Sequence, residues 1–82
     1  MKLTTQVNKF TEVFDTTVIK SGDAIRVSWK DAGKADFNAL VLASHPVWLH
    51  IILVSSKTEK ATPDYLYVED FIDGLFTISK IG

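Results

Sequence analysis

The chain of 82 residues contains no cysteine, which excludes disulfide bonds, thiolate catalysis and cysteine-based zinc sites. It also lacks a long hydrophobic run. The longest nearly apolar stretch, residues 47–54, includes His50 and is far shorter than the roughly 20 residues that a membrane-spanning helix needs. The first residues hold no apolar segment typical of a secretory signal, so we expect a cytoplasmic protein without membrane association. The four glycines are isolated, and no nucleotide-binding glycine motif occurs.

A strong charge of either sign is missing as well. Nine basic and ten acidic residues leave a net charge of −1, so the chain as a whole does not attract nucleic acid or anionic lipid. With 46% hydrophobic and 23% charged residues, the composition is that of a folded domain and not of a disordered segment. The length fits one small domain, which leaves little room for a deep active-site cleft.

Residues that favour β-strands are abundant. Val, Ile, Thr, Phe, Tyr and Trp together make up 32 of the 82 residues, so we predict a mainly β protein. The apolar patterns predict five strands, at residues 24–30, 36–44, 47–55, 65–68 and 75–81. A tight connection at residues 44–46 contains Pro46, a polar loop at 56–64 contains Pro63, and a single helical turn at 69–74 ends in glycine.

The second of these strands is apolar on both sides. Phe37, Ala39, Val41 and Ala43 share one side, while Leu40 and Leu42 lie on the other. Residues 16–20 are predicted to be extended and to cover that second side, although the same surface also suits a dimer contact. For residues 8–15 the sequence leaves helix and strand open, because apolar residues at helical spacing are mixed with β-branched ones.

The order of these elements resembles the SH3-like small barrels, a group that includes Tudor-like, KOW-like and PemK/MazF-like modules. The resemblance covers about 60 residues and is one of layout. The resemblance rests on the opening segment Gly22–Val27, the paired strands predicted at 37–44 and 47–55, and the turn at 69–74 before the last strand. It implies an uncharacterised bacterial SH3-like domain, in which residues 21–82 form a five-stranded barrel and residues 1–20 an N-terminal extension.

Residues with catalytic or metal-binding chemistry do not converge in the sequence. His45 and His50 are the only histidines, and their spacing on an extended chain points them to opposite faces. Glu69, Asp70 and Asp73 surround one turn, where they suit Mg²⁺ binding or simply a helix N-terminus. We therefore expect no metal site, no cofactor and no enzymatic activity.

Aromatic side chains are the most informative feature. If Leu49 and Leu53 face inward on the third strand, Trp48 and His50 face outward, and Tyr65 and Tyr67 do the same on the fourth. Because these strands are neighbours in an antiparallel meander, the four rings are predicted to share one surface. Such a surface suits a protein or peptide partner. The alternative is that the N-terminal segment covers it, through Phe10 and Phe14.

Arg26, Lys30 and Lys34 form the one local basic cluster, on the first strand and the loop after it. We predict a non-catalytic binding module that uses the aromatic residues, together with this cluster, to hold a protein or peptide. A nucleic-acid-binding barrel of the KOW or Tudor type is the alternative. A PemK/MazF-like ribonuclease fits less well, because no arginine precedes Pro46 and no acid–base pair is visible. Partner identity, oligomeric state and origin in a phage or mobile element stay open.

Overall fold

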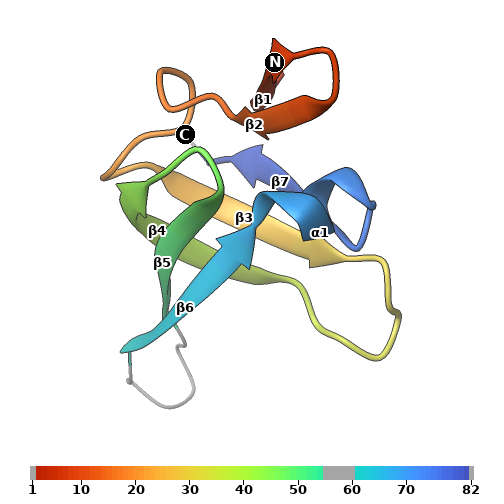
Figure 1. The fold of residues 1–82 in the computed structure, drawn as a ribbon. Coiled ribbons are helices and arrows are strands. Elements are labelled where there is room, and N and C mark those ends of the chain that lie inside the picture. The colour runs from red at the N-terminus through yellow and green to blue at the C-terminus, as the bar shows by residue number, and fades with distance from the viewer. Residues whose placement is uncertain (1, 55–60, 82) are drawn as a thin grey trace.

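The structure, a computed structural model, describes residues 2–54 and 61–81 and is mainly β (Figure 1). The elements, in chain order, are β1 (Thr4–Asn8), β2 (Thr11–Phe14), β3 (Ala24–Trp29), β4 (Phe37–Ser44), β5 (Trp48–Val54), β6 (Ala61–Tyr67), α1 (Val68–Ile72) and β7 (Phe76–Lys80). Within the described residues, no helix has the length and apolar character needed to cross a membrane.

Five of the strands form one antiparallel sheet in the order β6-β5-β4-β3-β7, and β1 and β2 form a separate hairpin. Figure 1 shows this hairpin above the sheet, and α1 below the hairpin at the end of β6. The last strand, β7, pairs with β3, so the two ends of the segment from residue 24 to 80 are neighbours. Among the described strands β6 and β7 do not pair, and no closed barrel is found.

The predicted strand phase is confirmed in the core. Alternate residues of each sheet strand are buried, which places one side of the sheet against the interior. These residues are Ile25 and Val27 on β3, Ala39 and Val41 on β4, Leu49 and Ile51 on β5, Leu66 on β6 and Phe76 on β7. Each large side chain buried in this way stabilises the fold by about 1.5–3 kcal/mol.

A β-bulge in β4 changes the phase at the end of that strand. Val41 lies opposite Ile51, but the register then shifts, and Ala43 lies opposite His50. The prediction that Ala43 shares the side of Val41 is therefore wrong, because the bulge adds one residue and reverses the alternation. Ser44 now occupies the core side, where its hydroxyl oxygen is buried without a hydrogen-bond partner among the described residues.

The first twenty residues contain a hairpin, which resolves the open choice for residues 8–15 in favour of strand. The predicted extended segment 16–20 is wrong, because this segment is a turn. The Asp15 carboxylate accepts the N–H of Thr17 (3.0 Å) and its hydroxyl (2.5 Å). A short polar side chain that binds the backbone two residues on is a strong turn former.

The hairpin and turn do not cover the outer side of β4 as predicted. They contribute to the core instead: Phe14 is 1% exposed, and Ile19 is fully buried. A second aspartate fixes the next turn, since the Asp23 carboxylate accepts the Lys20 N–H (2.8 Å) and forms an ion pair with Lys80 (3.2 Å) on β7. These hydrogen bonds hold the pKa of the Asp23 carboxyl below its usual value.

The prediction of a loop at residues 56–64 is wrong from residue 61 onward, because β6 begins at Ala61. Residues 56–60 of the predicted loop lie outside the described residues. Pro63 therefore sits within a strand, which the sheet tolerates because β6 is an edge strand. The predicted helical turn is confirmed as α1, followed by Gly74 with φ of +78°, a left-handed conformation that favours glycine.

Candidate functional site

The outer side of β5 and β6 brings the four predicted aromatic residues together. Trp48 lies directly opposite Tyr67, and His50 lies directly opposite Tyr65. The Val68 N–H donates to the Val47 carbonyl (2.8 Å), and by alternation the two aromatic pairs do not exchange backbone hydrogen bonds. Side chains of such pairs approach most closely, so the backbone itself brings the rings into contact.

Tyr65 is the central ring of this group. Its centroid lies 4.6 Å from that of His50 in a stacked arrangement, 5.5 Å from that of Trp48 in an edge-to-face arrangement, and 6.4 Å from that of Tyr67. Aromatic pairs at these separations contribute about 0.5–1.5 kcal/mol each beyond their burial. The rings therefore hold one another in place before any ligand arrives.

His45 joins the group, which the sequence did not predict. Its ring stacks on Trp48 at 4.6 Å and 5°, and its Nδ1 accepts the Val47 N–H (3.1 Å). Opposite faces were expected only for an extended chain. The tight connection at Pro46 bends the chain between the two histidines, and both join the same group of rings. We call His45, Trp48, His50, Tyr65 and Tyr67 the aromatic face.

Neither Phe10 nor Phe14 covers the aromatic face. Phe14 points into the core, where its ring lies 5.8 Å from that of Phe71, and Phe10 is 90% exposed near the tip of the hairpin. Tyr65 and Tyr67 remain 45% and 49% exposed. The alternative in which the N-terminal segment buries these rings is therefore wrong.

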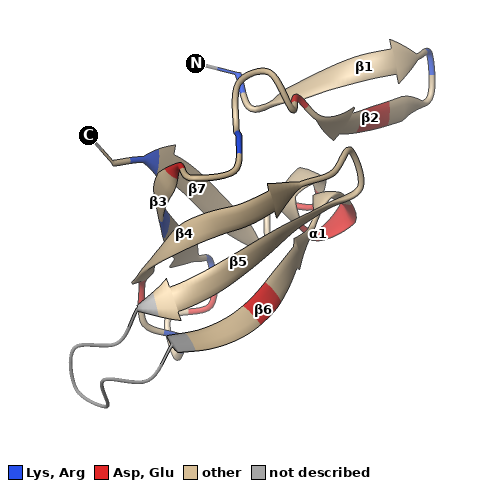
Figure 2. Cartoon of the chain, turned by 90° about the vertical axis from the view of Figure 1, so that its left-hand side faces the viewer, with Lys and Arg blue, Asp and Glu red and all other residues tan. Residues whose placement is uncertain are grey.

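The three strands that carry or adjoin the aromatic face are rich in apolar residues and hold a single charged one. β4 and β5 contain no charged residue and β6 contains only Asp64, as Figure 2 shows. Asp64 lies opposite Ile51, so it belongs to the other side of β6. On β4, Leu40 and Leu42 are 42% and 43% exposed and extend the apolar surface beyond the rings.

The free edge of β6 is protected against pairing with another strand. By the same alternation, the backbone N–H groups of Tyr65 and Tyr67 point away from β5, as would that of residue 63 if it were not proline. The Asp64 carboxylate accepts the Tyr65 N–H (2.8 Å). One edge donor is therefore absent and another is occupied, which disfavours the addition of a partner strand there.

The predicted basic residues do not join the aromatic face. Arg26 lies on β3, where it forms an ion pair with Asp36 (3.5 Å) and donates to the Asn38 side chain (3.2 Å). Lys34 lies in the β3–β4 loop, with its ammonium nitrogen 4.2 Å from the centre of the Trp29 ring. Lys30 lines the same pocket as Lys34. The aromatic residues and the basic residues predicted to bind a partner thus lie at separate places in the structure.

The three acids proposed from the sequence lie on or next to α1. Glu69 and Asp70 occupy its first turn, and the Asp73 N–H donates to the Glu69 carbonyl (2.9 Å) at its end. In residues 2–54 and 61–81, no group of three or more histidine or acidic side chains is arranged to hold a metal ion. The helix termination accounts for the position of Asp73.

Sequence and geometry therefore agree on four residues of the aromatic face, Trp48, His50, Tyr65 and Tyr67, and the structure adds His45. Comparison of the chain with protein-family models, with curated proteins and with solved structures finds no match.

Proposed function

We propose that this chain is a non-catalytic binding module whose aromatic face holds a short, uncharged peptide segment of a partner protein, rich in proline and aliphatic residues. The observation that carries the proposal is the exposure of rings that are already fixed by mutual contacts. Rigid aromatic rings provide contact area without a large loss of side-chain entropy on binding, which is why they dominate interface hot spots.

The size of the surface favours a peptide over a large protein surface. At roughly 200 Å² per aromatic side chain, the exposed fractions of Tyr65 and Tyr67 leave about 100 Å² of each available. With Leu40 and Leu42, the accessible apolar area is on the order of 350 Å², less than half of the roughly 800 Å² that each partner contributes to a standard protein–protein interface. A segment of a few residues matches this area.

The charge of the surface favours an uncharged ligand. Binding of nucleic acid takes most of its affinity from cations that neutralise phosphates. The outer sides of β4, β5 and β6 offer none, and Arg26 on β3 is already paired with Asp36. Aliphatic and proline side chains, in contrast, pack against ring faces without any ion.

The mode of binding follows from the protected edge of β6. A peptide that added a strand to this edge would need the N–H donors that Pro63 lacks and that Asp64 occupies at Tyr65. We therefore propose that the peptide lies across the sheet and is held by side-chain contacts. The scaffold we propose is an SH3-like small barrel. The first strand of the five-stranded sheet in chain order, β3, pairs with its last strand, β7, and this pairing supports the proposal.

Selection from a random peptide library, followed by calorimetric titration of the enriched peptides, tests this function. We expect peptides poor in charge and rich in proline and aliphatic residues. The double substitution Tyr65→Ser and Tyr67→Ser should weaken their binding by about tenfold or more, because two exposed hot-spot rings are lost. Phe10→Ser is the matched control: it removes a ring that is even more exposed but lies outside the aromatic face, and it should leave binding unchanged.

Three outcomes would overturn the proposal. Equal binding of the selected peptides to the double variant and to the parent chain would place their site elsewhere. Binding of an oligothymidylate to the aromatic face with strong salt dependence would indicate a nucleic-acid module. A dimer in sedimentation that the tyrosine substitutions dissociate would make a second copy the occupant of this face.

A further inference from the structure

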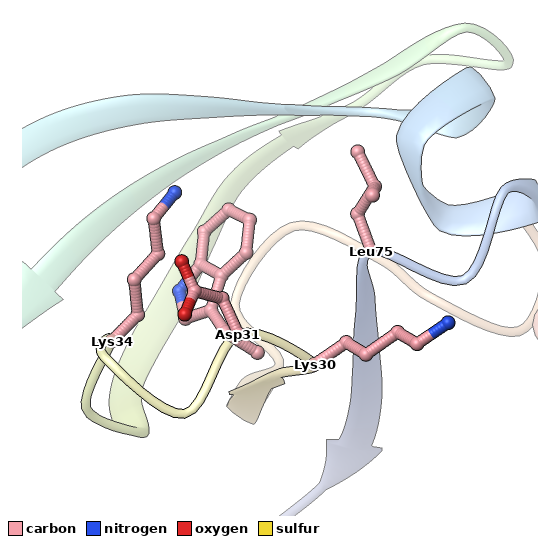
Figure 3. A pocket seen from close by; sticks show the side chains of 5 residues that line it. Lys30, Asp31, Lys34 and Leu75 are labelled. Carbon is pink, nitrogen blue, oxygen red and sulfur yellow. The ribbon is translucent and has the colours of Figure 1, made fainter.

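A separate pocket of about 340 Å³ lies where the β3–β4 loop meets the start of β7. Trp29, Lys30, Asp31, Lys34 and Leu75 line it (Figure 3). The Trp29 indole belongs to the core side of β3, in phase with Val27, whereas the aromatic face is on the outer side of the sheet. The two sites share no residue, so ligand binding in this pocket is independent of the function proposed for the aromatic face.

The pocket is built from side chains whose positions are fixed by neighbours. The indole of Trp29 is half-buried and packs edge-on against Phe76, with ring centroids 5.3 Å apart. The loop folds back on Asp31, whose carboxylate accepts the Gly33 N–H (2.9 Å) and whose carbonyl accepts the Lys34 N–H (3.0 Å). This turn brings the Lys34 ammonium to 4.2 Å from the centre of the indole ring.

The chemistry of the lining combines apolar walls with cations. The indole, Leu75 and the aliphatic stems of the two lysines supply the walls, and the two ammonium groups bring positive charge. In the described part of the chain, neither Lys30 nor Lys34 forms an ion pair. Asp31 is the one acid in the lining, and its carboxylate already accepts a backbone hydrogen bond.

We infer that this pocket binds a small amphiphilic anion, a flat apolar group that carries one carboxylate. The apolar group would lie against Trp29 and Leu75, and the carboxylate would pair with the ammonium of Lys34. Lys30 extends to the opposite side of the pocket, away from Lys34 (Figure 3), so the pairing with the carboxylate rests on Lys34. An apolar ligand without a carboxylate would contact the indole but leave the ammonium unpaired. A small anion without an apolar group would pair with the ammonium but leave the indole uncovered, so either ligand should bind more weakly.

The two tryptophans of the chain make the test specific, since Trp29 lies in this pocket and Trp48 in the aromatic face. The probe is 1-naphthoate, titrated into the ¹⁵N-labelled full chain while the two indole N–H resonances are followed. Trp48→Phe assigns them. We expect a saturable shift of the Trp29 resonance and none at Trp48, with 1-naphthamide, the neutral analogue, binding about fivefold more weakly.

Substitutions identify the groups responsible. Lys34→Gln should weaken 1-naphthoate about fivefold and remove the preference over 1-naphthamide, because the paired charge is gone. Leu75→Asp should abolish binding by charge repulsion, with an unchanged Trp48 resonance as evidence that the fold is intact. Lys9→Gln is the matched control, since Lys9 also lies over a ring, that of Phe10 at 5.7 Å, but outside the pocket.

The C-terminus of a peptide that ends in an apolar residue also carries a carboxylate next to an apolar group. A second arm of the experiment therefore titrates a short peptide that ends in phenylalanine, once with a free C-terminus and once with an amidated one, and compares its affinity with that of 1-naphthoate. Tighter binding of the free-acid peptide than of 1-naphthoate would assign the pocket to chain termini, and the reverse to free small molecules. A silent Trp29 resonance, equal affinity for the acid and amide probes, or an undiminished affinity in Lys34→Gln would overturn the inference.

Discussion

Phe10 and Phe14 lie four residues apart at the hairpin, and they should respond in opposite ways to the same substitution. Phe14 is 1% exposed and packs against Phe71, while Phe10 is 90% exposed. Replacing a buried phenylalanine with alanine costs about 3–5 kcal/mol, from lost burial and from the cavity that remains. A domain of 82 residues has a free energy of unfolding of roughly 4–12 kcal/mol, so Phe14→Ala should remove a large part of it.

Urea titration with tryptophan fluorescence as the readout measures this effect. With a slope of about 1 kcal/mol per molar urea, Phe14→Ala should lower the unfolding midpoint by about 3 M or leave the chain unfolded in water. Phe10→Ala should change the free energy of unfolding by no more than about 0.5 kcal/mol, as is usual for surface positions. Similar midpoints for the two variants would refute this prediction and show that the hairpin is not part of the core.

Two further predictions concern buried and exposed polar groups. Ser44→Ala should stabilise the chain by about 1 kcal/mol, because the buried hydroxyl has no hydrogen-bond partner among the described residues. Ser28→Ala should instead destabilise the chain by about 1 kcal/mol, because the 2.8 Å hydrogen bond to Asp36 is lost. Changes of the same sign in urea titrations of the two variants would contradict this prediction. Hydrogen bonds from Thr17 lower the pKa of Asp15 below 3.8, and those from Lys20 and Lys80 do the same for Asp23. Because the folded-state pKa is the lower one, the stability from each carboxylate is present above about pH 4 and is lost as the pH falls through the folded-state value. The melting temperature of Asp15→Asn and Asp23→Asn should therefore fall less than that of the parent chain between about pH 5 and pH 2, and an identical fall would refute the assignment.

The alternation of apolar residues was sufficient to predict most of each sheet strand and four of the five residues of the aromatic face. The buried side of β3 is marked by Ile25 and Val27, and that of β5 by Leu49 and Ile51. Because Trp48 precedes Leu49, it faces the opposite, outer side of β5. Such patterns are reliable because burial of one side of a strand dominates its energetics.

The features that the sequence did not predict depend on bulges, turns and loops, where side chains do not follow the alternation of a strand. The bulge in β4 reverses the phase of Ala43, and Ile19 reaches the core through a turn built by the Asp15 side chain. His45 joins the aromatic face only because the chain reverses at Pro46. The position of Lys34 over Trp29 is set by a loop, where alternation carries no information.

Pro63 and Asp64 have a consequence for the behaviour of the protein at high concentration. An open sheet with a bare outer strand can recruit identical copies one after another, and the growing stack becomes a cross-β fibre. Here the missing donor at Pro63 and the occupied one at Tyr65 disfavour such growth at the β6 edge. The chain can thus present uncovered rings to solvent on one side of its sheet while the adjoining edge resists polymerisation.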